Sequence, residues 1–428
     1  MPRPTTSYIR KAKKIVGYVH LWLGLLSGAV IFLSMIGAAI FVWEEELTDW
    51  YYADLIFNHQ KEPIGTLPVS ELHSAVTTAY PGKEFTFLEV TSDTHRNYAW
   101  MSYQPAEHPG WTWPSGVEHY LLVHVNPYTG EVVGAIDYKK DWIMLSRFLH
   151  QTLLLRYEVG TEIIGAAGLI MVIMALSGLV LWWPKTFRSL KRRVKVKWQG
   201  TFKRINWDAH AAGGFYTYLF LIFFAATGLV WSYTWWGDAI HRLLGDDPKA
   251  IFSFPEPPKI NAHNYLDGMD LAFDDAVSKR PNWQTIYFSV PKASSVKGSI
   301  TAGIYFKDKD IWWVPSDHYY YDPKTGEIYH TLLHEEKLTG EKWRYSNYEM
   351  HVGSIYGTPT KVIAFACAVF FGFLPISGFL IWWGRRKKEN LLLKKAHTIS
   401  SVGAGDPETK PYVRGTNPLP IDRNVMQD

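Results

Sequence analysis

Four long apolar stretches limit what this chain of 428 residues can fold into. Their central residues include no Asp, Glu, Lys or Arg, and a helix that crosses a bilayer needs about 20 predominantly apolar residues. The sequence therefore predicts an α-helical membrane protein with four transmembrane helices, at residues 16–43, 161–183, 209–236 and 361–383. We expect the first to be retained, because Trp43 and three glutamates follow it instead of a cleavage site with small residues.

The distribution of charge predicts the orientation of these helices. Residues 1–16, 184–207 and 384–428 together hold 23 of the 44 basic residues and only 5 of the 40 acidic residues. Basic residues accumulate on the cytoplasmic side of a membrane, so we expect the N-terminal segment 1–15, the loop 184–208 and the tail from 384 to be cytoplasmic. The tail is expected to be disordered. The topology already explains the basic loop, so lipid is the expected partner and nucleic acid is not.

Three short motifs occur twice, in the same order and with offsets of 190 to 200 residues. They are His20-Leu-Trp-Leu-Gly24 with His210-Ala-Ala-Gly-Gly214, Ser177-Gly178 with Ser377-Gly378, and Asn126-Pro-Tyr-Thr-Gly-Glu131 with Asp322-Pro-Lys-Thr-Gly-Glu327. Such duplication predicts two span-domain-span repeats. The regions 44–160 and 237–360 are then two domains on the outer side, each long enough to fold.

Both outer regions show a helical pattern followed by alternating strand patterns. The expected helices are 69–80 and 270–279, and the expected strands are 85–91, 98–103 and 119–125 in the first region and 285–290, 299–306 and 318–321 in the second. The Pro-x-Thr-Gly-Glu motif has the residues of a turn between two strands, because Pro presets φ and Gly supplies a positive φ. The sequence therefore predicts two α+β domains with structural hairpins.

Four of the 16 histidines occupy corresponding positions near the spans. His20 and His210 lie at the cytoplasmic ends of the first and third spans. His150 and His351 precede the second and fourth spans on the outer side, 28 and 27 residues before the glycine of the Ser-Gly motif. A histidine close to hydrocarbon needs a partner. The matching positions therefore predict two facing pairs at two depths.

Imidazole is a common axial ligand of haem iron, so the two pairs predict two haem b groups. His20 and His210 would ligate the inner iron, and His150 and His351 the outer iron. A bilayer core of about 30 Å is too thick for one cofactor to bridge. Two cofactors at different depths therefore suit electron transfer across the membrane.

Gly24 and Gly214 each follow a histidine of the inner pair by one helical turn, on the same face. Their missing side chains leave room for a porphyrin edge, so we expect both to contribute to cofactor binding. Each histidine taken alone has the alternative of a hydrogen-bonded interfacial side chain. Close helix packing is the alternative role for the other glycines, namely Gly28, Gly37, Gly178, Gly228 and Gly378. A zinc or copper site is less favoured, because it needs three or four ligands at one point.

The composition excludes several kinds of redox centre and of electron donor. The single cysteine, Cys367, excludes an intramolecular disulfide, a cysteine-based zinc site and a cysteine-ligated iron–sulfur cluster. The sequence has no dinucleotide-binding fingerprint and no P-loop, and its cytoplasmic segments are too short for a reductase domain. Electrons are therefore expected from membrane quinol or from a separate cytoplasmic reductase.

These motifs resemble the PepSY-associated transmembrane helix family over roughly residues 8–388. The residues that carry the resemblance are the H-x-x-x-G of the first span, Phe148-Leu-His150-Gln-Thr-Leu-Leu, the Ser-Gly-x-x-x-Trp-Trp end of the second span and the two Pro-x-Thr-Gly-Glu turns. Within that family, the siderophore-iron reductases of Gram-negative bacteria are similar in topology. The resemblance implies PepSY-like periplasmic domains, haem b in the inner membrane, and His20, His150, His210 and His351 as haem ligands.

Two classes of function follow. The first is an oxidoreductase that passes electrons through haem to a periplasmic ferric siderophore and releases Fe(II). Outer aromatic residues would form its docking platform, namely Trp111, Trp113, Trp312, Trp313 and Tyr319–Tyr321. The second is a membrane anchor or regulatory binding module without enzymatic activity, in which the histidines are structural. A permease is disfavoured, because the spans lack charged groups and broken helices.

Overall fold

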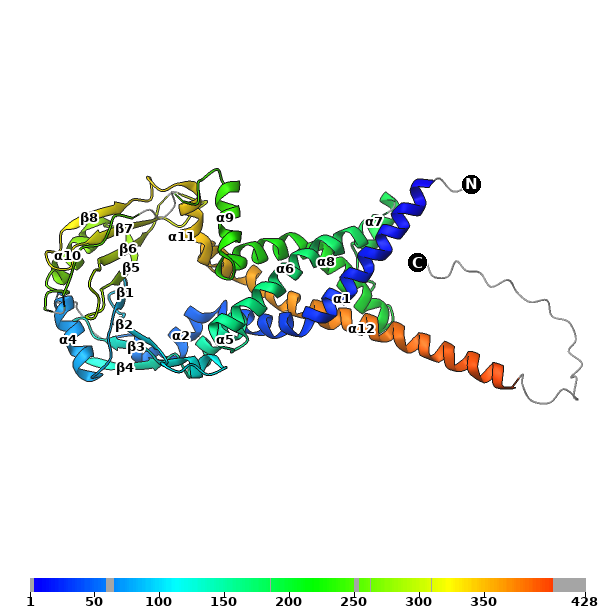
Figure 1. The fold of residues 1–428 in the computed structure, drawn as a ribbon, viewed down its shortest axis with the longest axis horizontal. Coiled ribbons are helices and arrows are strands. Elements are labelled where there is room, and N and C mark those ends of the chain that lie inside the picture. Colours follow the sequence, from blue (N-terminus) through cyan, green and yellow to red (C-terminus); the bar gives the residue numbers. More distant parts are fainter. Residues whose placement is uncertain are drawn as a thin grey trace, which may run out of the picture. The chain divides into compact units, whose positions relative to one another are not determined.

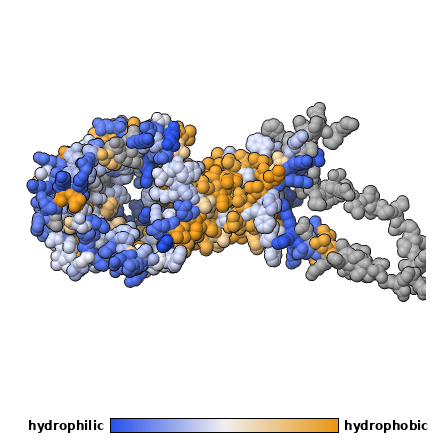
Figure 2. All heavy atoms as spheres, in the orientation of Figure 1, coloured by the Kyte–Doolittle hydropathy of each residue, from blue (hydrophilic) through white to orange (hydrophobic). Residues whose placement is uncertain are grey.

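The structure is a computed structural model that describes residues 4–58, 65–184, 186–249, 254–261, 263–308 and 310–402. Four of its helices are long and apolar enough to cross a membrane, and each overlaps one of the four predicted spans (Figure 1). The first three helices end before the predicted spans do, at Phe41, Trp182 and Gly228. They are α1 (Pro4–Phe41), α6 (Tyr157–Trp182), α8 (Phe202–Gly228) and α12 (Thr358–Val402). Their side chains form an apolar band in the space-filling view (Figure 2).

The last helix extends beyond its predicted span. The chain divides into two compact units, Met1–Phe379 and Leu380–Asp428, and α12 continues into the second unit as far as Val402. Residues 384–402 are therefore helical, and the expectation of a disordered tail is wrong for them. Arg, Lys, Leu and Ala in this segment all favour a helix. The remainder of the tail, 403–428, lies outside the described residues.

All eight strands of the first unit belong to one antiparallel sheet with the order β4-β3-β2-β1-β5-β6-β7-β8. The strands are β1 (Phe87–Thr91), β2 (Tyr98–Pro105), β3 (Val117–Val125), β4 (Val132–Asp137), β5 (Trp283–Ser289), β6 (Ile300–Phe306), β7 (Ser316–Tyr321) and β8 (Ile328–Leu332). Five residue pairs, from Phe87↔Ser289 to Thr91↔Thr285, join β1 to β5. The two outer regions therefore share a single sheet.

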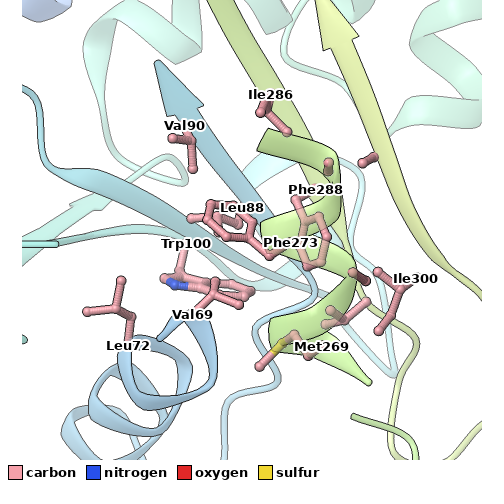
Figure 3. Packing of buried hydrophobic residues seen from close by; sticks show 14 of the residues in the cluster. Val69, Leu72, Leu88, Val90, Trp100, Met269, Phe273, Ile286, Phe288 and Ile300 are labelled. Atoms are coloured by element: carbon pink, nitrogen blue, oxygen red, sulfur yellow. The ribbon is translucent and has the colours of Figure 1, made fainter. Parts of the chain in front are cut away.

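One face of this sheet is covered by α4 (Val69–Ala79) and α10 (Met269–Lys279). Figure 3 shows the core between the helices and the strands, where side chains of both regions pack together. Trp100 from β2 and Ile286 from β5 are fully buried in this core. Alternation along the strands sends one set of side chains into the core and the other set to the opposite face.

Shorter helices lie at the opposite face and beside the bundle. They are α2 (Glu44–Tyr51), α3 (Ala53–Ile56), α5 (Trp142–Thr152), α9 (Thr234–Leu243) and α11 (Thr339–Val352). A second hydrophobic cluster, which includes Trp113, Ile136 and Phe148, packs α5 against the strands of the first region. A further helix, α7 (Phe187–Arg193), lies in the basic loop. The helices α5 and α11 connect the sheet to the transmembrane helices.

The duplicated Pro-x-Thr-Gly-Glu motif is a hairpin turn in both places, as predicted. Gly130 and Gly326 both have a φ of 73°, and each turn precedes the last strand of its region. The turns also bind the helices on the sheet: the Leu67 N–H donates to the Pro127 carbonyl (2.8 Å), and the Gly268 N–H to the Pro323 carbonyl (2.7 Å). Their role is therefore structural.

Candidate functional site

The inner histidine pair consists of His20 on α1 and His210 on α8. Their ring centroids are 6.4 Å apart, and the ring planes are nearly perpendicular, at 88°. Each Nδ1 lies 2.8 Å from a serine hydroxyl, Ser177 on α6 for His20 and Ser377 on α12 for His210. The structure thus brings the two predicted residues together and fixes each ring through a different helix.

The outer pair consists of His150 on α5 and His351 on α11. Their ring centroids are 5.9 Å apart, with an interplanar angle of 34°. The Nδ1 of His150 lies 2.9 Å from the Ser34 hydroxyl, and that of His351 lies 2.9 Å from the Thr227 hydroxyl. Neither histidine is on a transmembrane helix, but both are held against one by these hydroxyl groups.

The hydrogen bonds determine which nitrogen of each ring carries the proton. The hydroxyls of Ser177, Ser377 and Thr227 each donate to a backbone carbonyl of their own helix, so their lone pairs remain to accept a hydrogen from Nδ1. The Nδ1 of His150 also lies 3.1 Å from the Ser34 carbonyl, which can only accept. All four rings therefore carry the proton on Nδ1 and leave the Nε2 lone pair for a ligand.

Burial keeps the outer pair neutral. It lowers the pKa of His150, and it lowers the pKa of His351 to about 3, with a smaller contribution from the neighbouring His150. A neutral imidazole is the form that binds a metal. The outer rings are therefore held in a ligating state at neutral pH.

Three glycines make space for the histidine rings. A Cβ on Gly178 would lie 3.3 Å from Cε1 of His20, and one on Gly378 would lie 3.4 Å from Cε1 of His210. At Gly228 the corresponding distance to Cε1 of His351 is only 2.9 Å, so a larger residue there would displace the ring. These positions need glycine because of the histidines, and not only for helix packing.

The two glycines predicted to border a cofactor, Gly24 and Gly214, differ in the space around them. A Cβ on Gly214 would have no atom within 4 Å beyond its own helix backbone and chain neighbours. A Cβ on Gly24 would lie 2.9 Å from the terminal methyl group of Met174, a flexible side chain. There is therefore open space beside the inner pair at Gly214, whereas space at Gly24 requires Met174 to move.

The two pairs lie at two levels of the bundle. Fourteen residues of α1 separate His20 from Ser34, the partner of His150, which corresponds to about 21 Å at a rise of 1.5 Å per residue. Between the levels lies an apolar cluster with Leu221 and Phe371 at its centre, in which Phe371 is 3% exposed. This packing excludes water from the space between the pairs.

A pair of histidines suits a metal whose other ligands are supplied by a cofactor and not by the protein. A bond from a metal to imidazole is about 2 Å long and the ring centre lies roughly 1 Å behind the nitrogen, so a metal between two rings needs centroids about 6 Å apart. Both pairs meet this requirement. Among the described residues no group of three or more His, Cys, Asp or Glu side chains could hold a metal ion. Two histidines on opposite sides match the axial positions of haem.

A polar cluster of Glu44, Glu89, Arg147, Tyr287 and Glu349 lies on the side of the sheet that faces the outer pair. Glu89 and Tyr287 are opposite each other on the central ladder, and Arg147 and Glu349 lie within one helical turn of the outer histidines. Burial raises the pKa of both Glu44 and Glu349 to about 7. Acidic and phenolic groups therefore adjoin the outer histidines.

The raised pKa of Glu44 predicts a stability that depends on pH. Burial, with the nearby Glu89, keeps Glu44 protonated in the folded state up to about pH 7, whereas the unfolded chain releases this proton near its ordinary value of 4.5. Folding stability is then present in full below pH 4.5 and is lost as the pH rises through 7. Glu44→Gln should raise the free energy of unfolding by about 1–3 kcal/mol at pH 8 and leave it unchanged at pH 4.5.

Thermal unfolding of the detergent-purified protein at the two pH values measures this difference. Glu71→Gln is the matched control, because Glu71 is an exposed carboxylate on α4. A gain for Glu44→Gln that is equal at both pH values would contradict the prediction.

The sequence pattern does not reveal the four hydroxyl partners, Ser34, Ser177, Thr227 and Ser377. The Ser-Gly motif was visible as a duplicated feature, but nothing in it indicated that Ser177 and Ser377 contact histidines. The predicted aromatic platform is borne out only in part. Trp111 and Trp312 are exposed, whereas Trp113, Tyr319 and Tyr321 are buried in the two hydrophobic cores. Spacing along one helix does not show which neighbouring helix a side chain will face.

Comparison with known proteins identifies the sequence class. The model of the family described as the PepSY-associated TM region matches residues 18–385. The match contains all four histidines, their hydroxyl partners and the whole sheet. No curated protein matches the chain.

Proposed function

This chain belongs to the PepSY-associated TM family, and we propose that it is a haem b oxidoreductase of the bacterial inner membrane. It would carry electrons across the membrane to a ferric siderophore in the periplasm and so release Fe(II) for iron acquisition. The two pairs would hold two haems, His20 with His210 and His150 with His351.

One observation supports this proposal most strongly: two histidine pairs at different levels share the same construction. In each pair the centroids are about 6 Å apart. Each ring has its Nδ1 on a hydroxyl or carbonyl oxygen, which leaves the Nε2 lone pair for a ligand. A structural histidine needs only one of these features. Their occurrence at four positions favours ligation.

The chain's own groups have separate roles in this function. The imidazoles would hold iron from both sides, and the hydroxyls of Ser34, Ser177, Thr227 and Ser377 fix the ring orientations. The apolar cluster around Phe371 keeps the space between the levels dry. When bound, haem supplies an iron that accepts and gives up one electron at a time.

We also propose that the chain consists of two span-domain-span repeats with a periplasmic sheet and with both termini in the cytoplasm. The matched serines of the inner pair and the matched hairpin turns support the duplication, and the positions of the basic segments support the orientation. The outer pair and the polar cluster then lie on the periplasmic side.

The polar cluster supports the choice of electron acceptor. Phenol and carboxylate groups beside the outer pair suit a polar chelate better than an apolar substrate. Hard oxygen ligands bind Fe(II) less strongly than Fe(III), so each electron delivered there would loosen the iron. The donor would be membrane quinol or a cytoplasmic reductase.

The visible spectrum of the purified full-length protein tests the proposal. The oxidised protein should show a Soret band, and dithionite should produce sharp α and β bands with two haem equivalents per chain. Addition of a ferric hydroxamate siderophore to the reduced protein should reoxidise both haems. A colourless protein after expression with haem supplied would contradict the proposal and favour the alternative of a membrane-anchored binding module.

A further inference from the structure

A cavity of about 300 Å³ lies where the two outer regions meet, on the side of the sheet that α10 covers. It is lined by residues of the β1–β2 loop, by Tyr128 of the first hairpin turn, by α10 and by the start of β5. Phe273, one of its lining residues, belongs to the core between α10 and the sheet. The cavity is therefore on the opposite face of the sheet from the polar cluster and apart from the histidine pairs.

Four aromatic side chains line this cavity, namely Tyr98, Tyr128, Phe273 and Trp283. Aromatic rings that surround a space attract a cation through the negative faces of their π systems. Tyr98 and Phe273 are in contact, with centroids 6.2 Å apart. Burial raises the pKa of Tyr98 to about 12, so its phenol is neutral and remains a hydrogen-bonding group.

The charges of the lining are mainly negative. Asp93 and Asp274 are both in the lining, and neither forms an ion pair with another of the described residues. The one basic residue, Arg96, is already neutralised, because two of its nitrogens donate to the carboxylate of Asp49 at 2.7 Å. The cavity thus combines aromatic faces with an uncompensated negative charge.

We propose that this cavity binds a small organic ammonium ion. The aromatic residues would contact the cationic head, and Asp93 and Asp274 would balance its charge. The volume suits a small ligand, since pockets for drug-sized molecules are typically about 300–1,000 Å³. A ligand in this cavity would contact residues from both outer regions.

Choline is the probe for this proposal, measured by calorimetry with the full-length protein in an uncharged detergent. One choline should bind per chain, and its neutral isostere 3,3-dimethylbutan-1-ol should bind at least about tenfold more weakly, as loss of a cation–π contact requires. Asp274→Asn should weaken choline binding about fivefold, while Glu71→Gln on α4 should leave it unchanged.

A second pair of variants separates binding from folding. Trp283→Leu should weaken binding at least about tenfold, and Trp283→Phe should retain most of it, because phenylalanine keeps an aromatic face. Glycerophosphocholine serves as a further probe: if it binds as choline does, the source of the ligand is a lipid headgroup, and if choline alone binds, the source is a free ammonium compound.

Saturable choline binding that is equal for the neutral isostere, or that is unaffected by both Asp274→Asn and Trp283→Leu, would overturn the proposal. Absence of any saturable binding of choline would overturn it as well. Because the measurement does not involve haem, its result is independent of the proposed redox function.

Discussion

His210→Ala should remove one of the two haem equivalents and leave the other spectrally unchanged. His210 supplies one of the two imidazoles of the inner pair, whereas the outer pair depends on α5 and α11 and on hydroxyls about 21 Å further along the bundle. Removal of second-shell partners alone typically costs 10–100-fold in metal affinity, and loss of the ligand itself should cost at least that much. The haem-to-protein ratio, measured by pyridine haemochrome absorbance, gives the result.

The electron-transfer consequence is measured in the same variant. Reduction of a ferric siderophore by electrons supplied from the membrane donor should fall by at least about tenfold. Dithionite, which reaches the outer face directly, should still reduce the remaining haem. His263→Ala is the matched control, because His263 lies on the loop before α10 and is exposed. Retention of both haems in His210→Ala would show that the ligand assignment of the inner pair is wrong.

Gly228→Val should abolish the outer haem and leave the inner one. A Cβ at this position already lies 2.9 Å from Cε1 and 3.6 Å from Nε2 of His351. A valine adds two methyl groups at the same point, and the His351 ring is already hydrogen-bonded to Thr227, the preceding residue of α8. The ring must therefore rotate or shift away from its position beside His150.

Resonance Raman or low-temperature EPR spectra of the variant distinguish the two haems by their ligand fields. Gly237→Val is the control, because a Cβ at Gly237 on α9 would have no atom within 4 Å beyond its own helix and chain neighbours. A Gly228→Val protein with two intact low-spin haems would contradict the assignment of His351.

Much of the site could be predicted from the sequence because it depends on periodicity and duplication. The spans followed from apolar length. The outer histidines followed from matching positions relative to Gly178 and Gly378, and the inner ones from matching positions relative to Gly37 and Gly228. Six strands were predicted within a few residues, since alternation is a local signal, but β4 and β8 were not. Residues 384–402 are helical, in contrast to the predicted disordered tail.

Other features could not be predicted, for a physical reason. The pairing of β1 with β5 joins segments about 200 residues apart, and the alternation of each strand is the same whether its neighbour comes from its own region or from the other. The contacts of Ser34 and Thr227 likewise depend on how α5 and α11 return to the bundle. Such contacts are fixed by tertiary packing.

The ladder between β1 and β5 has a consequence for how a molecule can enter. Many two-lobed receptors capture a ligand by closing about a hinge. Here the two outer regions are joined by five residue pairs between β1 and β5 and by one shared core. Separating the regions would expose Trp100 and Ile286 to water, so they form one continuous sheet without a hinge. Under the proposed function, an incoming chelate would therefore have to pass around the edge of this sheet, where its size and shape would be screened before electron transfer.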